Sequence, residues 1–583
     1  MTRVRNLLIS VAAGLAATIS VLSIMQARQD TSLLKYAALS VISICFFYAF
    51  LKLRKQILQS VLEKRYITVG IILLSVYTLI SLIDWPLFIN RPWYETVLVD
   101  LISLATIFCF FSFIAFILLR SGYMWQKTTV SKWQILWYML PMIFVWMFYL
   151  LAFFPGNMSP DSLNHWRQVE NMEFNNWHPF AYTMVILVLT TIWDSPAIIV
   201  IFQILLMSFV YSYGIYSFRQ YGLGKGIAWI AALLWAVLPV NGIFSTILWK
   251  DVVYSTFIVF LTLFVMKTVL QEGKNLRTWS GISTFTIVLL GIAFFRNNGL
   301  PIAILTAIGM LIAYRRNWKQ LLTPLVLVSA LYIVVTGPVF TAYNIQSANP
   351  NESMSIPTQQ IAAVVSQDGE LTEEQLTYLD SILPIDDWDA YNPYLTDRIK
   401  FHDNFKDDVI VADMGKYISV WFEIVKQNPA IVVEAYLKQT SLIWQINKPI
   451  DGYTNPYTID VDPNSMGLET KPVSQTLYDV IEYGLETSRY HTEELFWRPV
   501  VFSILIVLFS LIASRKLGAI AWLPILPVLL NTGTMFVGLP AQDYRYQVSN
   551  CMVSIFFLLF ACLYKKGKEP THGEHANSTQ QSQ

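Results

Sequence analysis

The sequence has few charges, few cysteines and no glycine-rich phosphate-binding loop. Only 14% of its 583 residues are charged, whereas soluble domains carry about 25%. Hydrophobic residues make up 55% of the chain and gather in long blocks, many close to the roughly 20 residues with which a helix crosses a bilayer. This pattern excludes a soluble enzyme, a nucleic-acid-binding protein and a disordered chain. It predicts a multi-pass membrane protein that is embedded in the lipid bilayer.

The scarcity of cysteine narrows the cofactor classes. The four cysteines all lie in apolar blocks, and none belongs to a CxxC pair. This spacing predicts neither a disulfide framework nor a cysteine-based zinc site. The sequence also lacks a GxxxxGK[ST] segment, so we expect no bound nucleotide. We therefore predict no cofactor.

Charge is unevenly distributed along the chain. Residues 343–497 contain 25 of the 39 acidic residues but 9 of the 40 basic residues. The net charge of this stretch is therefore −16, and that of the remainder is +17. We predict an acidic, mainly helical domain set into a basic membrane protein. The polar tail at 565–583 is predicted to be disordered.

The topology follows from the basic loops. We distinguish 15 apolar blocks, and positive charges in short loops mark the cytoplasmic side. If block 179–193 crossed the membrane, every later basic loop would fall outside, whereas all of them become cytoplasmic if this block lies on the outer surface. The block is about 15 residues long, which is short for a span. We therefore predict about 14 spans, with both termini in the cytoplasm and the acidic domain outside.

These features define an all-α polytopic membrane protein. A four-span N-terminal addition precedes a membrane core, and the acidic extracytoplasmic domain is inserted before the last three spans. The predicted boundaries are 1–132 for the addition, 133–342 for the core, 155–179 for its outer loop, 179–193 for an interfacial helix, 343–497 for the domain and 498–564 for the last spans.

The outer loop carries the first candidate site residues. Ser159-Pro160 predicts a helix start, and a carboxylate at Asp161 is favoured by the free N–H groups there. His165 follows at helical spacing and shares a face with Asp161. His178 precedes a proline that opens the next helix. Asp161 is interpreted either as a cap or as a functional carboxylate, and His178 either as a structural donor or as a ligand for phosphate or a hydroxyl.

Three later segments place further charges at the outer ends of spans. They contain Lys250 and Asp251, then Arg296, then Arg545 beside Tyr546. Ionisable residues at membrane depth usually face a polar cavity, and an arginine fork suits phosphate oxygens. The alternatives are that the lysine extends to the membrane surface and that the tyrosine belongs to the interfacial aromatic belt.

Together these residues predict an outward-facing site that combines carboxylates with cations. Such a composition suits a lipid-linked phosphate substrate, because the cations would hold the phosphate at the headgroup level. A carboxylate, for which Asp161 is the candidate, would then deprotonate an acceptor hydroxyl as general base.

The pattern of an early loop aspartate, a His-Pro pair, a later Lys-Asp pair and a C-terminal Arg-Tyr pair resembles the GT-C glycosyltransferase superfamily. That superfamily includes protein O-mannosyltransferases and aminoarabinose transferases. More closely, the chain resembles an uncharacterised bacterial family, most familiar from Gram-positive genomes, that is placed beside those enzymes. The resemblance covers roughly residues 133–564.

The resemblance implies inverting transfer from a polyprenyl-phosphate sugar donor to a cell-envelope glycan, lipid or protein at the outer face of the bacterial plasma membrane. It assigns the base to Asp161, the His-Pro position to His178, the second acidic position to Asp251, and the phosphate contacts to Arg296, Arg545 or Lys250. Mannosyltransferases have Asp-Glu where this chain has Asp161-Ser162, so a divalent metal is left unsupported.

Two other functions stay open. One is a flippase or transporter of glycans, which predicts charges deep in several spans and paired broken helices. The other is a polymerase or ligase of lipid-linked glycans. The acidic domain is interpreted either as a lid or as an acceptor-selecting surface, on which tryptophans such as Trp388 would stack on sugars.

Overall fold

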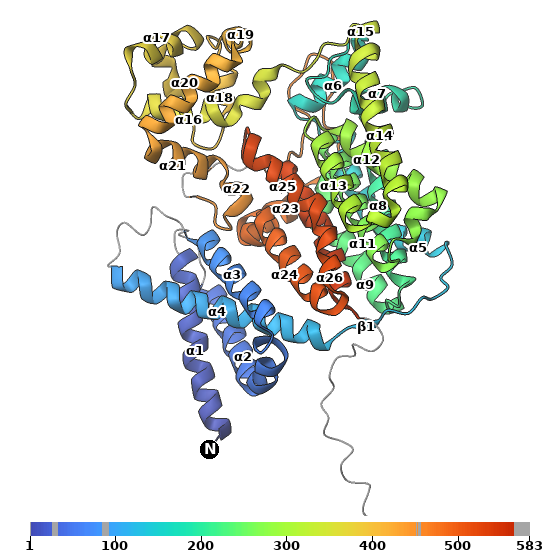
Figure 1. Cartoon of the computed structure of the whole chain (residues 1–583), viewed down its shortest axis with the longest axis vertical. Coiled ribbons are helices and arrows are strands. Elements are labelled where there is room, and N and C mark those ends of the chain that lie inside the picture. Colours follow the sequence, from blue (N-terminus) through green and yellow to red (C-terminus); the bar gives the residue numbers. More distant parts are fainter. Residues whose placement is uncertain (1, 26–32, 84–92, 450–451, 453–455, 565–583) are drawn as a thin grey trace, which may run out of the picture.

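The computed structural model describes residues 2–25, 33–83, 93–449, 452 and 456–564. These residues are mainly helical, as predicted (Figure 1). The named strands among them are two short segments, β1 (Tyr123–Met124) and β2 (Leu563–Tyr564), which pair in parallel.

Eight helices among the described residues are long and apolar enough to cross a membrane, which supports the predicted multi-pass protein. These helices are distributed over the N-terminal, central and C-terminal parts of the chain. The eight are Arg65–Leu82, Trp93–Arg120, Gln134–Ala152, Pro196–Arg219, Lys250–Leu270, Arg315–Ala342, Pro499–Leu517 and Ala519–Gly538.

The N-terminal helices form a separate group that packs against α24 (Pro499–Leu517) through α3 and α4 (Figure 1). The backbone N–H of Ile446 also donates to the carbonyl of Ser81 at 2.7 Å. The bounds of the group are α1 (Thr2–Met25), α2 (Leu33–Ile57), η1 (Leu58–Leu62), α3 (Arg65–Leu82) and α4 (Trp93–Arg120).

The core continues from α5 to α15 and is completed by the C-terminal helices. Its elements are α5 (Gln134–Ala152), α6 (Pro160–Asn171), α7 (Phe180–Thr190), α8 (Pro196–Arg219), α9 (Lys225–Val237), α10 (Pro239–Phe244), α11 (Lys250–Leu270), η3 (Lys274–Arg277), α12 (Trp279–Phe295), α13 (Gly299–Ala313), η4 (Arg315–Asn317), α14 (Trp318–Val334), η5 (Val335–Val339) and α15 (Phe340–Ala342). The C-terminal elements are α24, η8 (Ala519–Ile525), α25 (Leu526–Gly538), η9 (Tyr544–Gln547), α26 (Val548–Ala561) and β2.

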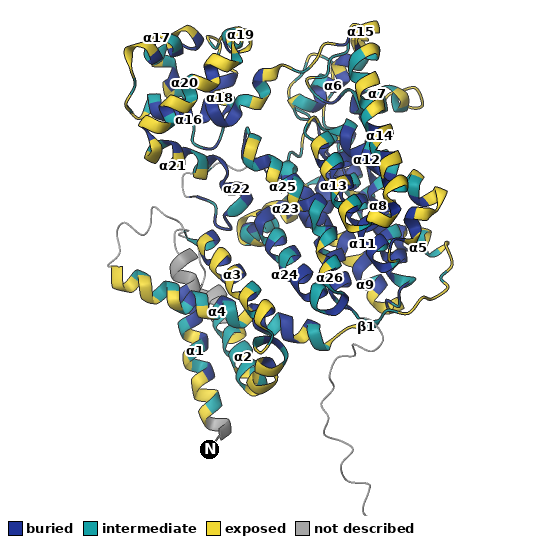
Figure 2. Ribbon diagram, in the orientation of Figure 1, coloured by how far each residue is buried: buried dark blue, intermediate teal, exposed yellow. Residues whose placement is uncertain are grey.

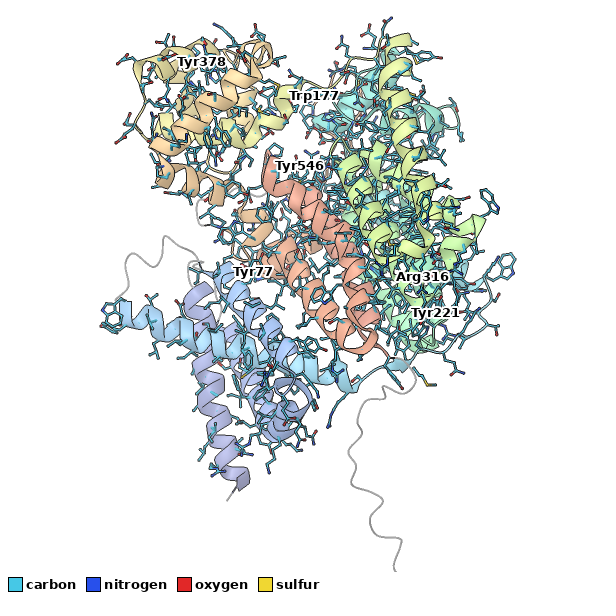
Figure 3. The ribbon with its side chains drawn as sticks, viewed as in Figure 1. Tyr77, Trp177, Tyr221, Arg316, Tyr378 and Tyr546 are labelled. Carbon is cyan, nitrogen blue, oxygen red and sulfur yellow. The ribbon has the colours of Figure 1, made fainter. Side chains whose placement is uncertain are left out.

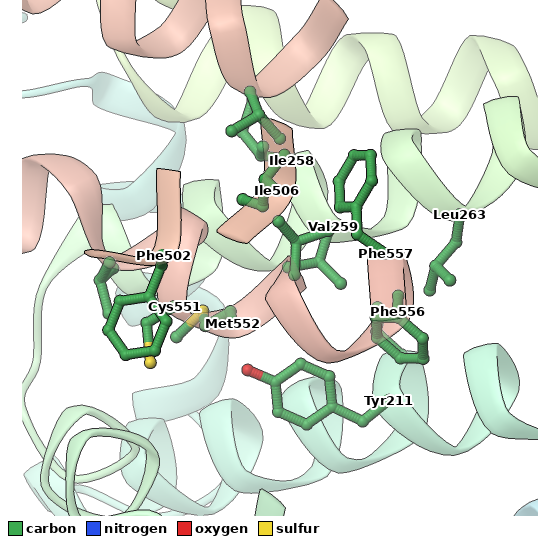
Figure 4. Close-up of a cluster of buried hydrophobic side chains, with 14 of the residues drawn as sticks. Tyr211, Ile258, Val259, Leu263, Phe502, Ile506, Cys551, Met552, Phe556 and Phe557 are labelled. Atoms are coloured by element: carbon green, nitrogen blue, oxygen red, sulfur yellow. The ribbon is translucent and has the colours of Figure 1, made fainter. Parts of the chain in front are cut away.

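Helix α11 lies at the centre of this bundle. In the apolar stretch of α11, 83% of the residues are buried, whereas in that of the helix Arg315–Ala342, which includes α14, 11% are buried. Tyr211 stacks on Trp235 with 5.1 Å between ring centroids, and Phe556 packs against Trp235. Figure 4 shows Tyr211 and Phe556 in the cluster of buried side chains that includes Leu263 of α11. Many large apolar residues are exposed, for example Ile230, Leu305 and Val326, and Figure 2 shows exposed positions along the outward faces of the bundle helices. This is the arrangement expected where lipid replaces water.

The bundle has two distinct ends. At one end, called the β1 end here, Lys516 Nζ donates to the carbonyls of Leu118 and Ser121 at 2.6 and 3.0 Å. At the opposite end, called the α6 end, the loop before α6 forms single β-bridges from Asn157 to Ile247 and from Met158 to Val461. These bridges fix the position at which α6 begins.

The acidic stretch contains a small helical core of its own, within residues 361–432. Trp388 is fully buried there, and its indole N–H donates to the carbonyl of Leu383 at 2.9 Å. The expectation that Trp388 stacks on sugars is therefore wrong. The elements are η6 (Pro350–Met354), α16 (Ser355–Ser366), α17 (Glu373–Ile382), η7 (Ile385–Ala390), α18 (Asp397–Lys400), α19 (Asp407–Ala412), α20 (Met414–Gln427), α21 (Pro429–Gln439), α22 (Ser441–Trp444) and α23 (Gln475–Phe496).

The turn after α5 leaves no room for a side chain at Gly156. Its φ is +130°, and a Cβ there would lie 2.6 Å from Val200 and 2.8 Å from Leu248. We expect Gly156→Ala to destabilise the protein by about 1–3 kcal/mol, because it combines backbone strain with overpacking. Gly226→Ala is the matched control, since a Cβ at this position in α9 meets open space. Thermal unfolding in detergent measures both, and equal unfolding temperatures would contradict the prediction.

Candidate active site

The N-terminus of α6 is capped by serine side chains, so the Asp161 side chain is not needed as a cap. Pro160 occupies the first helical position, and the backbone N–H of Ser159 donates to Ser162 Oγ at 3.3 Å. Ser159 Oγ in turn accepts a hydrogen bond from the indole of Trp249 at 2.7 Å. The cap is therefore built by the two serines, and the carboxylate of Asp161 makes its contacts elsewhere.

Asp161 lies at the centre of a cluster of cations. Its Oδ2 accepts hydrogen bonds from Lys250 Nζ at 3.0 Å and from Arg545 Nη1 at 2.7 Å. Its Oδ1 lies 3.6 Å from His178 Nε2. Burial alone would raise the pKa of Asp161, but Arg545 and Lys250 outweigh this effect and hold the pKa well below its usual range. Asp161 is therefore ionised at neutral pH.

His178 is neutral and oriented by Lys250. The ammonium of Lys250 lies 3.2 Å from His178 Nδ1, which can only accept from it, so the proton of the ring belongs on Nε2 and faces Asp161. Burial, together with the charge of Lys250, lowers the pKa of His178 to about 3. Trp177 stacks on the ring, with centroids 5.1 Å apart.

Asp251 and Arg296 form a second, less saturated pair. Arg296 Nη1 lies 3.4 Å from Asp251 Oδ1, and Lys250 Nζ lies 3.9 Å from Asp251 Oδ2. Among the described residues, neither carboxylate oxygen of Asp251 nor Nη1 of Arg296 has a hydrogen-bond partner. Buried groups of this kind are rarely left without partners, so the pair is positioned to meet a ligand.

Aromatic rings hold the two guanidinium groups. Arg545 lies over the ring of Trp249 at 4.9 Å, and Arg296 lies over Tyr546 at 4.8 Å and Tyr254 at 5.5 Å. Rings of this kind attract a cation without neutralising it. The guanidinium groups therefore stay oriented and charged.

Arg545 also has an acidic neighbour in its own loop. Its Nε lies 2.8 Å from Asp543 Oδ2, and its backbone N–H donates to Asp543 Oδ1 at 3.1 Å. Burial raises the pKa of Asp543 to about 6, although Arg545 opposes this shift.

His165 lies behind His178. Its Nδ1 is 2.7 Å from Thr183 Oγ1, and its ring centroid is 5.3 Å from that of His178. Burial lowers the pKa of His165 well below its usual value, so this ring is neutral too. Its Nε2 has no hydrogen-bond partner in the described part of the chain.

The structure thus brings together all eight residues that the sequence singled out, although Asp161 and Arg545, for example, lie 384 positions apart along the chain. Sequence analysis missed the supporting groups. Asn531, in the middle of an apolar helix, accepts a hydrogen bond from Tyr254 at 2.9 Å and donates to the carbonyl of Tyr546 at 3.3 Å. A polar side chain inside a predicted span was the available signal.

An apolar cavity of about 330 Å³ opens beside the charged cluster, between α7, α12, α14 and η5. Two asparagines that flank site residues contribute to its lining. They are Asn176, two positions before His178, and Asn297, which follows Arg296 and donates to the carbonyl of Trp177 at 3.3 Å. Most of the remaining lining is apolar, for example Phe180, Phe294 and Phe340.

The described residues contain no group of three or more histidine, cysteine, aspartate or glutamate side chains arranged to hold a metal ion. The carboxylates of Asp161 and Asp251 are instead paired with lysine and arginine.

Residues 174–577 match a family described as a family of unknown function, DUF6020. This chain belongs to DUF6020. The matched region contains His178, Lys250, Asp251, Arg296 and Arg545, whereas Asp161 and the whole of α6 precede it. The chain matches no curated protein and no solved structure.

The neutral state of His178 makes the stability of this DUF6020 protein depend on pH. Its pKa is about 3 in the folded protein and near 6.5 in an unfolded chain. Between these values the unfolded chain binds the extra proton, so the histidine destabilises the fold as pH falls, by at most about 1.4 kcal/mol per pH unit. As pH falls from 7 to 4.5, we expect the unfolding temperature of the wild type to fall more steeply than that of His178→Gln.

The matched control for this titration is His491→Gln, which changes an exposed histidine on α23. Its unfolding temperature should follow that of the wild type across the same pH range. Parallel curves for His178→Gln and the wild type would show that His178 takes up a proton in the folded protein, against the prediction.

Proposed function

We propose that this DUF6020 protein is an integral membrane glycosyltransferase of the GT-C type. It transfers a sugar from a polyprenyl-phosphate donor to a cell-envelope acceptor at the outer face of the bacterial plasma membrane. The observation that carries the proposal is the arrangement of Asp161, bound by two cations, beside the unsaturated pair of Asp251 and Arg296 and next to an apolar cavity.

The arrangement of the helices supports about 14 spans with α7 at the interface. Both ends of α7 lie at the α6 end of the bundle, because His178 precedes it beside Asp161 and Trp193 follows it with its ring 6.5 Å from that of Phe154. With α7 excluded, the basic loops gather at the β1 end, which is therefore the cytoplasmic side. The site then lies at the outer face.

The donor phosphate is placed on Arg296, Lys250 and Arg545. Arg296 carries a guanidinium nitrogen without a hydrogen-bond partner among the described residues, and a guanidinium binds phosphate through paired N–H groups. The apolar cavity beside it accommodates the first part of the lipid chain, because burial of hydrocarbon there removes it from the aqueous surface.

Binding of the phosphate also explains how Asp161 acts as a base. A carboxylate paired with two cations is a weak base, and a phosphate that attracts Lys250 and Arg545 frees it. Asp161 then accepts the proton of an acceptor hydroxyl while the hydroxyl oxygen attacks the anomeric carbon. The bond from this carbon to the phosphate oxygen breaks, its electron pair leaves with the phosphate, and the anomeric centre is inverted.

The reaction is tested with Asp161→Asn, which keeps the shape of the side chain. We expect a strain that lacks the gene to lose one sugar substituent from its envelope glycans, the wild type to restore it, and Asp161→Asn to restore less than about 1% of it. Mass spectrometry of the envelope glycans measures the outcome. Asp386→Asn, at an exposed position of the acidic domain, is the control that should restore fully.

Full restoration by Asp161→Asn would refute the role of this carboxylate. Loss of whole polymers from the deletion strain, in place of a single substituent, would instead indicate a polymerase or a flippase.

Donor binding is tested separately with geranylgeranyl phosphate and the purified full chain. We expect Arg296→Gln to weaken binding roughly ten- to a hundredfold, because a hydrogen bond to a charged group contributes about 1.5–3 kcal/mol. Arg489→Gln, at an exposed position on α23, should leave the affinity unchanged. Equal affinities for Arg296→Gln and the wild type would contradict the placement of the phosphate.

A further inference from the structure

The acidic domain is docked directly onto the loop that carries Arg545. The backbone N–H of Thr396 donates to the carbonyl of Pro540 at 3.0 Å, and Leu395 forms an antiparallel bridge with Ala541. The buried amide of Gln439 strengthens the junction by donating to the carbonyl of Leu539 at 2.7 Å. This docking fixes the short helix α18 next to the site.

The first residue of α18 is Asp397, a carboxylate that faces charges of both units. Burial raises its pKa to about 6, while Lys400 lowers it, Glu352 raises it, and Arg545 and Asp161 of the site act on it as well. Tyr546 responds in turn, because burial raises its pKa and Asp397 adds to the shift. The domain therefore adds a carboxylate to the surroundings of the site, besides Asp161, Asp251 and Asp543, and this carboxylate is mostly ionised at pH 7.

Phe401, the residue that follows α18, lies beside an aromatic residue that contacts the site. The ring of Phe401 lies 6.2 Å from that of Trp177, which stacks on His178. Phe401 is 57% exposed and Trp177 is 39% exposed. Figure 3 shows Trp177 between the acidic domain and α6, with Tyr546 at the end of α25. Two exposed aromatic rings thus lie beside His178, and Asp397 is the first residue of the short helix that Phe401 follows.

We propose that Asp397, Phe401 and Trp177 form an acceptor subsite that binds a sugar ring, so that the acceptor is a glycan. This inference rests on the proposed function and names its acceptor class. The C–H face of a sugar ring is apolar and packs on aromatic faces, while its hydroxyl groups donate to a carboxylate. A ring bound in this way presents one hydroxyl toward Asp161.

Saturation-transfer NMR on the full chain in lipid nanodiscs tests the subsite. The probes are three neutral trisaccharides (maltotriose, cellotriose and the trimer of N-acetylglucosamine) and a serine- and threonine-rich peptide. We expect at least one trisaccharide to give a signal that Asp397→Asn, Phe401→Ala and Trp177→Ala each reduce at least fivefold. The matched controls Asp386→Asn and Phe422→Ala, which change exposed residues of the same domain, should leave the signal unchanged.

Phe401 is largely exposed, so its replacement tests binding without disturbing a core. The proposal is overturned if none of the trisaccharides binds, if the three substitutions leave the signal intact, or if the peptide binds through these residues instead. Geranylgeranyl phosphate binding, measured on the same samples, tests the donor site separately. Donor binding in the wild type without sugar binding would reject the glycan subsite and keep the transferase, whereas absent donor binding would reject the proposed function itself.

Discussion

The ion pairs of Asp161 with Lys250 and Arg545 organise this end of the molecule. They join the start of α6, the start of α11 and the segment η9 before α26, which are far apart in the sequence. Three charges taken from water are stable only together, because the loss of one partner leaves the others buried and uncompensated. The same contacts that bring these segments together therefore also gather a group of charges at the α6 end of the bundle.

Aromatic rings hold the arginines of this group in place without taking up their charge. Trp249, Tyr254 and Tyr546 support the guanidinium groups from their faces. Asn531 accepts a hydrogen bond from the hydroxyl of Tyr254 and donates one to the backbone carbonyl of Tyr546. A ring restrains a cation but leaves its N–H groups able to bind an anion. The unsaturated contact between Asp251 and Arg296 persists because the surrounding structure fixes both side chains, and it is the most direct indication that a ligand completes the site.

The acidic domain belongs to this arrangement and is not a separate appendage. Its backbone pairs with the loop before Arg545, and Asp397 and Phe401 mark the two ends of the short helix α18 beside that loop. The negative charge of the domain thus lies next to the cations of the site, where it opposes the approach of anions from solution. A phosphate that arrives within the membrane plane avoids this barrier, which agrees with a lipid-linked donor.

The sequence by itself determined the membrane class, the helical fold and the segments that carry charge at the ends of spans. Long apolar blocks leave the backbone one way to satisfy its hydrogen bonds in lipid, so these features follow from local pattern. Only the tertiary structure decided that serines cap α6 in place of Asp161, that Trp388 belongs to a buried core, and that Asp397 reaches the site. Each of these outcomes depends on which distant segments meet, and neither periodicity nor spacing records such contacts.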